Sequence, residues 1–339
     1  MTDYVVLEAR DRSGGRIHGV AATPEAVAQD AKIFDLGAAW FWPDWQPELA
    51  QLVAGLDLET VLQDESADML VERSLHVQPV RMSGLMAEPP SFRLQGGMTA
   101  LVTALQRQID PDRFLARMPV RQLHLTDGSL RIVSETGVTC RAEHVLLALP
   151  PGLAAGLAFD PLLPPALLRQ WQQTETWMAP HAKYLAVYRE PFWQTAGLSG
   201  FASSRIGPLN EIHDLSSPDG PAALFGFFAA PASFRSRMTD DALREQCRIQ
   251  LVRLFGPQAA TPVFDVIKDW SQDGFTAAAA DHQSSGQHPH PPAIGPDSGV
   301  WKNRIVGIAS EWSTTFPGYL AGAVDAARRG VGLLLAGQD

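Results

Sequence analysis

The sequence contains little cysteine and no long apolar run. Its two cysteines, Cys140 and Cys247, lie far apart and show no spacing typical of a metal site or a disulfide framework. We therefore expect both to be reduced, as in a cytoplasmic protein. The apolar run at 331–336 is far shorter than the roughly 20 residues that a bilayer span needs, and no basic segment followed by an apolar one opens the chain. We expect no membrane anchor.

Positive charge is also scarce, with 27 Lys and Arg against 37 Asp and Glu in 339 residues, a net charge of −10. No basic block is present to follow a phosphate backbone, so nucleic acid is not an expected partner. His288-Pro289-His290 could suggest a metal, but no third ligand lies nearby, and we predict a solvated loop and no metal site. Asp214 is expected to cap a turn or pair with an arginine. The length suits two domains.

A G-x-G-x-x-G phosphate loop is missing as well, although the N-terminus has the segment that usually follows one. Val5 to Leu7 reads as a strand, Glu8 ends it, and a basic glycine turn follows at 9–16. In a dinucleotide-binding unit such an acid bonds the adenosine ribose, and the glycine loop lies about 20 residues upstream. Only seven residues precede Glu8. We expect a start assigned too far downstream, with about 30 residues missing, and poor FAD binding by this chain.

Periodicity predicts the remaining elements. One helix is expected from Pro47 to Leu56, a second opens at Gly96-Gly97-Met98 with Leu101, Leu105 and Ile109 on one stripe, and a third, Gly/Ala-rich, begins with Pro317 and runs to Leu335. A fourth covers Asp240 to Phe255. Residues 84–90 and 284–298 read as irregular. The expected strands are a meander at 120–125, 130–134 and 138–141, turning at Asp127-Gly128 and Thr136-Gly137, a buried parallel strand at 144–149, and strands at 183–188, 211–215, 223–228, 263–270 and 304–309.

Several short motifs occur in a consistent order along the chain. They are Leu7 to Arg16, Asp35-x-Gly37-x-x-Trp40, Gly96-Gly97-Met98, Ala148-Leu149-Pro150, Lys183 with Tyr188 and Pro191-Phe192-Trp193, and Glu311 followed by Gly318-Tyr319-x-x-Gly322-Ala323-Val324. As a set they resemble the flavin-containing amine oxidase family, which includes the monoamine oxidases. The resemblance implies an α/β fold: a Rossmann-like FAD domain, here N-terminally truncated, at 1–44, 93–170 and 271–339, and a mixed-sheet substrate domain at 45–92 and 171–270.

The resemblance also implies a set of residues that contact FAD. Glu8 would hold the ribose, Val120 would meet the adenine, and Glu311 would bond the ribityl or pyrophosphate region. The free N–H groups at the start of the helix expected from Pro317 suit the negative charge of a reduced flavin. The full cofactor set is Glu8, Ala9, Arg10, Gly14, Gly15, Arg16, Gly37, Ala38, Trp40, Val120, Trp270, Glu311, Gly318, Tyr319 and Ala323.

Two residues are expected to act in catalysis. Lys183 is one of only four lysines, with Lys32, Lys268 and Lys302, and it alternates with Leu185 and Val187 on the expected buried face of a strand. In the family this lysine holds a water against flavin N5; the alternative is a strand-end lysine that reaches solvent. Tyr319 is expected over the flavin face.

The sequence departs from the monoamine oxidases at Ala279 and Ala280, where those enzymes have the flavin-linking cysteine and a second cage tyrosine. We therefore expect non-covalent FAD and a more open site. The resemblance implies hydride transfer from an amine carbon to flavin N5, giving an imine that water hydrolyses, with O2 or another acceptor reoxidising the flavin and O2 yielding peroxide.

Two alternatives stay open: a desaturase or dehydrogenase of the same superfamily acting on an apolar substrate, and a flavin-free non-catalytic homologue. The amine substrate, the acceptor and the oligomeric state are left open by the sequence.

Overall fold

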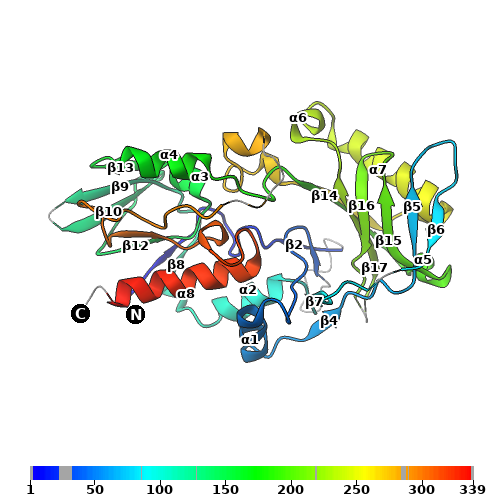
Figure 1. The fold of residues 1–339 in the computed structure, drawn as a ribbon, viewed down its shortest axis with the longest axis horizontal. Coiled ribbons are helices and arrows are strands. Elements are labelled where there is room, and N and C mark those ends of the chain that lie inside the picture. Colours follow the sequence, from blue (N-terminus) through cyan, green and yellow to red (C-terminus); the bar gives the residue numbers. More distant parts are fainter. Residues whose placement is uncertain are drawn as a thin grey trace.

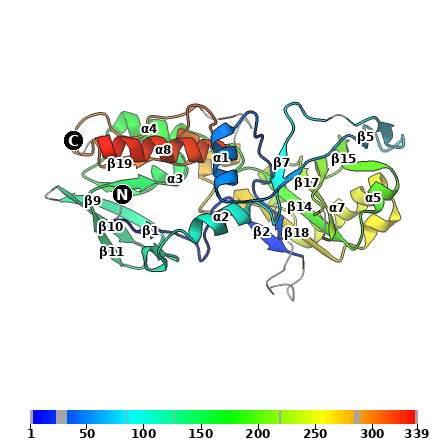
Figure 2. The same ribbon diagram turned by 90° about the horizontal axis from the view of Figure 1, so that it is seen from below.

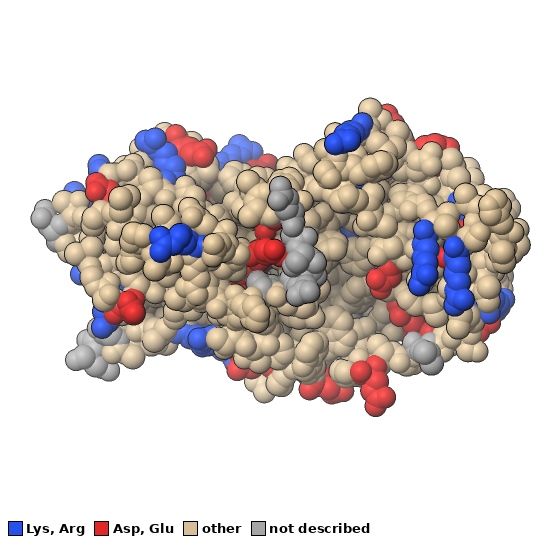
Figure 3. Space-filling model, turned by 45° about the horizontal axis from the view of Figure 1, so that its top comes forward, with Lys and Arg blue, Asp and Glu red and all other residues tan. Residues whose placement is uncertain are grey.

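The computed structural model describes residues 3–22, 33–84, 86–126, 128–217, 220–283, 288 and 290–336. Figure 1 shows an elongated molecule of two lobes, with β8 (Phe114–Leu115) and α8 (Leu320–Ala336) in the same lobe. Figure 2, seen from below, places α1 and α2 where the lobes meet. Lys and Arg are scattered over the face drawn in Figure 3 without merging into one basic patch.

One lobe is built on a seven-stranded mixed sheet. Its strand order is β18-β14-β17-β16-β15-β5-β6, and all neighbours pair antiparallel except β15 with β5. The predicted strands at 183–188, 211–215, 223–228 and 263–270 are four neighbouring strands that begin at one edge of this sheet. The strands are β5 (Asp68–Glu72), β6 (Val80–Met82), β14 (Ala182–Tyr188), β15 (Leu198–Ser204), β16 (Leu209–Asp214), β17 (Ala222–Phe228) and β18 (Phe264–Asp269).

Both faces of this sheet are covered, so β14 is buried along its whole length. Tyr184, Ala186 and Tyr188 point to one face, where α7 (Asp240–Phe255) packs through Leu243, Cys247 and Leu251. Leu185 and Val187 point to the other face, where they meet Phe34 and Ala39 of the N-terminal segment. The alternation of a strand therefore places Lys183 on the face that looks toward the N-terminal motifs.

The second lobe contains short parallel strand pairs. Strand β1 (Val6–Leu7) pairs with β8 (Phe114–Leu115), and β12 (Val145–Leu147) pairs with β19 (Ile305–Gly307). The sequence predicts one parallel sheet here, but no described strand joins the two pairs. The predicted meander is confirmed as β9 (Val120–Thr126), β10 (Ser129–Ser134) and β11 (Thr139–Ala142), with β13 (Ala158–Asp160) parallel to β9. Asp127 of the expected turn lies outside the described residues.

The core of this lobe is aromatic. Trp171 and Trp312 meet edge to face with ring centroids 5.6 Å apart, and both are fully buried beside Ile305 and Leu147. A smaller core joins α1 (Pro47–Gly55), α2 (Thr99–Gln106) and the start of α8 (Leu320–Ala336) through Leu49, Leu101 and Ala321. Trp171 thus packs with the cofactor-side strands, although it lies at the start of the predicted substrate domain.

Two helix predictions need correction. Helix α2 ends at Gln106, so Ile109 lies beyond it, and Leu105 is 37% exposed, which leaves only Leu101 of the predicted stripe buried. Helix α8 begins at Leu320 and not at Pro317. The cause is Gly318, whose φ of +86° is left-handed and whose N–H donates to the Ser310 carbonyl, so the chain turns before the helix starts.

The remaining elements are short. The predicted irregular segment at 284–298 is described at 288 and 290–298, where no helix or strand forms, and residues 284–287 and 289 lie outside the described residues. The short elements are β2 (Gly19–Ala21), β3 (Ile33–Asp35), β4 (Thr60–Leu62), β7 (Phe92–Leu94), α3 (Pro151–Ala154), α4 (Pro165–Gln173), α5 (Phe192–Thr195) and α6 (Ala232–Arg235).

Candidate functional site

The loop from Asp35 to Trp40 is the point where the predicted motifs meet. The N–H groups of Leu36 and Gly37 both donate to the His18 carbonyl, just after the glycine turn. A Cβ on Gly37 would lie 1.9 Å from the Arg16 carbonyl oxygen, so only glycine allows this contact. On its other side the loop accepts hydrogen bonds from Lys183 and Trp270. The structure therefore joins three motifs that are far apart in sequence.

The glycine turn itself has the conformation that its sequence requires. Gly14 and Gly15 have φ of +98° and +57°, and a Cβ on Gly15 would meet no atom within 4 Å. Glu8 is half-buried and accepts the Arg10 N–H at 2.8 Å through Oε1, whereas Oε2 accepts no hydrogen bond from the described residues. His18 Nδ1, in the same place, is buried without a described hydrogen-bond partner. Glu8 Oε2 and His18 Nδ1 are therefore available to hydrogen-bond a polar ligand.

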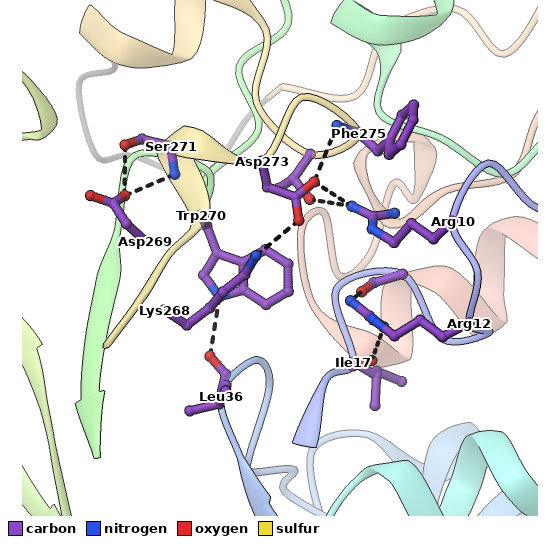
Figure 4. Close-up of polar contacts among 12 residues, drawn as sticks. Arg10, Arg12, Ile17, Leu36, Lys268, Asp269, Trp270, Ser271, Asp273 and Phe275 are labelled. Atoms are coloured by element: carbon purple, nitrogen blue, oxygen red, sulfur yellow. Dashed lines mark hydrogen bonds and ion pairs between the residues drawn. The ribbon is translucent and has the colours of Figure 1, made fainter. Parts of the chain in front are cut away.

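The arginines of this turn already have partners. Figure 4 shows Arg10 reaching Asp273, with Nη2 to Oδ1 at 2.6 Å, and Lys268 binding the same carboxylate at 3.0 Å. Arg12 donates to backbone carbonyls of its own turn, including that of Ile17 (Figure 4). Asp273 therefore ties the N-terminal turn to the end of β18. Burial raises the pKa of Asp273, but Lys268 and Arg10 outweigh burial and hold that pKa below its usual value.

Arg16 forms a two-bond ion pair with Glu311. Nη1 donates to Oε1 at 2.5 Å and Nη2 to Oε2 at 3.0 Å, and the Glu311 side chain is wholly buried. Burial works against the charge of Arg16, but the Glu311 carboxylate outweighs it and raises the pKa of Arg16. Two predicted cofactor residues are thus brought together, and the guanidinium that was expected to offset a pyrophosphate is held chiefly by a carboxylate.

Lys183 is buried, which excludes the alternative of a solvent-reaching strand-end lysine. Its side chain is 4% exposed, and Nζ donates to the Gly37 carbonyl at 2.6 Å. The amine lies 4.5 Å from the ring centroid of Phe225, 5.1 Å from that of Phe227 and 5.9 Å from that of Trp40. Burial lowers the pKa of Lys183 to about 8, while the negative charge of Asp35 acts in the opposite direction.

Asp35 is the buried counter-charge of this lysine. It is 2% exposed, and both carboxylate oxygens accept the Met98 N–H, at 2.9 and 3.0 Å. Burial raises the pKa of Asp35 to about 6, against the hydrogen bond from Met98 and the charge of Lys183. It also lines a cavity of about 20 Å³ with Arg93, whose Nε is buried without a described partner. Such a cavity has room for one water.

Tyr319 stands in an aromatic cluster and has no recorded contact with Lys183. Its ring stacks on His288 at 4.8 Å and lies 5.2 Å from the ring of Trp177, while Trp42 and Trp45 meet it edge to face. The hydroxyl is 3.2 Å from His288 Nε2. His288 is exposed, as the predicted solvated loop requires, yet it closes one side of Tyr319. Pro289 lies outside the described residues.

The other predicted residues fall at the edges of this arrangement. Val120 begins β9 and is half-buried against the core of its lobe, and Ala323 lies in the first turns of α8. Ala279 and Ala280 lie in a 3-10 turn at Ala279–Gln283. Asp214 caps the turn at Ser216 as predicted, but its other oxygen accepts from Trp193 and Gln194 and not from an arginine. Among the described residues no three His, Cys, Asp or Glu side chains gather as a metal site requires.

Sequence reasoning missed three charged residues of the site. Lys268 lies on a strand that was read only as part of the substrate sheet, and Asp273 follows that strand; nothing in their spacing pointed to Arg10. Asp35 was part of a quoted motif but received no role. A carboxylate inside the apolar run 33–36 was the available signal, because a buried acid needs a cation or an N–H partner.

Comparisons with known proteins identify the family of this chain. The sequence matches the family described as flavin containing amine oxidoreductase over residues 2–81 and 69–335. A "Probable flavin-containing monoamine oxidase A" from Dictyostelium discoideum is 28% identical over 249 residues, 70% of this chain and 52% of that protein. The chain thus spans about half the length of the curated relatives that it matches.

Solved structures share the fold. Cyclohexylamine oxidase from Brevibacterium oxydans gives a TM-score of 0.79 over 99% of this chain and 94% of that chain, at 16% identity. Wild-type putrescine oxidase bound to putrescine gives 0.77 over 98% and 93%, at 18% identity. The comparisons confirm the α/β fold class and the flavin-containing amine oxidase family that the sequence predicts. The chain belongs to the flavin-containing amine oxidoreductase family.

Proposed function

We propose that this chain binds FAD without a covalent link and oxidises a small-molecule amine at the carbon next to nitrogen, with O2 as the acceptor. The observation that carries the proposal is the buried Lys183 amine, held by an aromatic wall against the Asp35–Trp40 loop, which also contacts the glycine turn. Family membership and the amine oxidase folds of the structural relatives support it. We also keep the domain division given above and a cytoplasmic location as proposals.

The residues present fit the cofactor. Glu8 offers an unused carboxylate oxygen to the ribose hydroxyls, and the open Gly14-Gly15 turn lets a pyrophosphate approach the backbone. When bound, FAD would supply the redox chemistry by accepting a hydride and passing two electrons to O2. The alanines at 279 and 280 offer no thiol for a covalent link, so acid denaturation should release all the flavin into the supernatant.

The role that we propose for Lys183 is to hold a water and its proton near the reacting atoms. Its pKa of about 8 leaves a fraction of the amine neutral at physiological pH, so that it can accept as well as donate a proton. The apolar rings around Nζ exclude other water. Trp177, Trp42 and Trp45 around Tyr319 offer aromatic faces and edges to an amine substrate.

The test is Lys183→Met, which keeps the length of the side chain and removes its charge and hydrogen bonds. In flavin-loaded enzyme, anaerobic reduction by amine and reoxidation by O2 are followed separately by flavin absorbance in a stopped-flow instrument. We expect reoxidation to slow by about a hundredfold and reduction to change much less. Normal rates in both half-reactions would remove Lys183 from the mechanism. A panel of amines assayed for peroxide tests the activity itself, and reduction only by an apolar non-amine substrate would favour the desaturase alternative.

A further inference from the structure

A buried histidine on the substrate sheet is separated from the Lys183 amine by one aromatic ring, and it belongs to no predicted motif. His213, on β16, is 6% exposed. Its Nδ1 is 2.8 Å from Glu65 Oε1 and its Nε2 is 2.9 Å from Glu211 Oε1. Ionised carboxylates only accept hydrogen bonds, so both ring nitrogens must carry a proton for both bonds to form. The geometry therefore describes an imidazolium held between two carboxylates.

The ring of His213 also fixes two of the aromatic rings that surround Lys183. It stacks on Phe225 at 5.4 Å with an interplanar angle of 23°, and it meets the edge of Trp40 at 4.8 Å. In the sheet, Phe225 stands directly opposite His213 on one side and opposite Leu185 on the other. The same Phe225 ring lies under the Lys183 amine. One aromatic ring thus separates the two cations.

A ring of hydrogen bonds closes this arrangement. Trp40 Nε1 donates to Gln63 Oε1 at 3.2 Å, and Gln63 Nε2 lies 3.1 Å from the Asp214 carbonyl and 3.4 Å from Glu65 Oε1. Hydrogen bonds therefore connect Trp40 to His213 through Gln63 and Glu65, and the ring contact between Trp40 and His213 completes the link between the N-terminal loop and the substrate sheet. If one member is removed, the indole of Trp40 loses its fixed position.

We propose that His213 is a positioning residue for the Lys183 amine: as an imidazolium clamped by Glu65 and Glu211, it fixes Trp40 and Phe225 as the aromatic wall against which that amine is held. This rests on the proposed function only for its effect on catalysis, because the positioning itself is a property of the protein without substrate. Burial lowers the pKa of His213, but the hydrogen bonds to Glu211 and Glu65 outweigh burial and raise it, so the clamp opens as pH rises through that pKa.

The experiment uses the fact that the chain has only four lysines. Protein labelled with ¹³C at the lysine side chains gives four sets of Cε signals, and Lys183→Met identifies that of Lys183. Because Nζ lies over Phe225, Phe227 and Trp40, ring currents should displace the Lys183 Hε signals upfield of those of the exposed Lys302. In His213→Gln we expect these signals to move toward the Lys302 position. An unmoved Lys183 signal would overturn the proposal.

The matched control is His124→Gln. His124 also pairs with a carboxylate, its Nδ1 lying 3.0 Å from Asp160 Oδ2, but it stands on β9 in the other lobe. This variant should leave the Lys183 signal in place. If it moves that signal as far as His213→Gln does, the effect is general and the proposal fails.

A second variant covers the case in which His213→Gln does not fold. Glu211→Gln removes one half-exposed carboxylate and keeps the ring, so the pKa of His213 should fall. The other charged groups in this region are Glu65 and, beyond Phe225, Lys183, together with Arg93, which interacts with Asp214 and Asp35. Lys183→Arg, Asp35→Asn and Arg93→Gln backgrounds identify any titration that belongs to those groups. We expect the aromatic signals of Trp40 to shift with the titration of His213, at lower pH in Glu211→Gln than in wild type. The proposal would be overturned if the Trp40 signals did not shift as His213 titrates.

In flavin-loaded enzyme, His213→Gln should slow reoxidation by about tenfold to a hundredfold, because the Lys183 amine is no longer held in place. If Lys183→Met proves to have normal half-reactions, the proposed role of Lys183 fails, but the displacement of its signal by His213→Gln still decides the positioning. If the Lys183 signal stays fixed while Lys183→Met is slow, the positioning fails and the proposed function stands.

Discussion

The two lobes differ in how completely their sheets are covered. In the substrate lobe, β14 has a strand on each side and a packed layer on each face, with α7 on one and the segment 33–40 on the other. In the cofactor lobe, β1 and β12 each pair with one described strand, and the charged contacts of Arg10, Arg16 and Asp273 join the pieces. Both lobes have buried apolar cores, and in the cofactor lobe ion pairs also join segments that are far apart in the sequence.

The largest expected effect is on the free energy of unfolding, and it compares the cores of the two lobes. Leu251→Ala on α7 removes a side chain that is 1% exposed and should cost about 2–5 kcal/mol of the free energy of unfolding. Leu7→Ala on β1 removes a half-buried leucine from a strand of two residues and should cost about 1 kcal/mol. Urea unfolding followed by circular dichroism measures both. Equal costs would mean that the strand pairs are packed as tightly as the seven-stranded sheet.

A second prediction concerns the ion pairs. Glu311→Gln leaves Arg16 buried beside a neutral amide and should cost about 3 kcal/mol. Asp68→Asn breaks the exposed pair with Arg81 on the substrate sheet and should cost only about 0.2–1 kcal/mol. Both variants keep the shape of the side chain, so urea unfolding compares the charges alone. A small cost at Glu311 would show that the cofactor lobe does not depend on this pair.

The regular elements follow from the sequence because each is decided locally. The predicted bounds Asp240 to Phe255 are those of α7, where the Thr239 side chain caps the first turn and Gly256, with φ of +98°, ends the last. The C-terminal helix was placed three residues early because Pro317 has the signature of a first helical residue. The left-handed turn at Gly318 overrides that signature through a bond to Ser310, which the local sequence does not reveal.

Site residues could be predicted only where a short sequence motif determines the local backbone conformation or the face of the strand on which a residue lies. The glycine turn, Lys183 and Glu311 were found in this way, and the structure brings the first two to one loop. Asp273 and the Glu65–His213–Glu211 clamp were not, because their partners come from segments up to 263 residues apart and their pairing depends on the fold.

The third prediction tests the cofactor lobe by its ligand. Glu8→Ala should weaken FAD binding by about tenfold or more, since a hydrogen bond to a charged group contributes about 1.5–3 kcal/mol. The free energy of unfolding should fall by only about 0.5–1.5 kcal/mol, because Glu8 accepts one hydrogen bond, from the Arg10 N–H to Oε1. Equilibrium titration of the protein with FAD, followed by flavin fluorescence, measures the affinity, and Glu59→Ala on an exposed loop is the control. An unchanged affinity would mean that the ribose binds elsewhere.

The smallest expected effect is the change that the charge of Asp35 makes to the pKa of Lys183. Lys183 titrates with a pKa of about 8, and the charge of Asp35 raises that pKa against burial. Asp35→Asn should therefore lower the titration midpoint of Lys183, as read from its ¹³Cε signal between pH 6 and 10, by about one unit. A lysine pKa below its unfolded value means that its stabilising contribution is present above pH 10.5 and is lost as pH falls through about 8.

The pKa of Asp35 is shifted in the opposite direction, above its usual value. Its folded pKa of about 6 lies above the usual 3.8, so its contribution to stability is present below pH 3.8 and is lost as pH rises through about 6. Unfolding of Asp35→Asn at pH 5 and pH 7 should then differ less than unfolding of the wild type at the same two values, because the amide cannot ionise. Asp64→Asn, at an exposed carboxylate in a turn, provides the control. If Asp35→Asn leaves the Lys183 midpoint where it is, the two charges do not interact, and the aromatic wall alone sets the state of the amine.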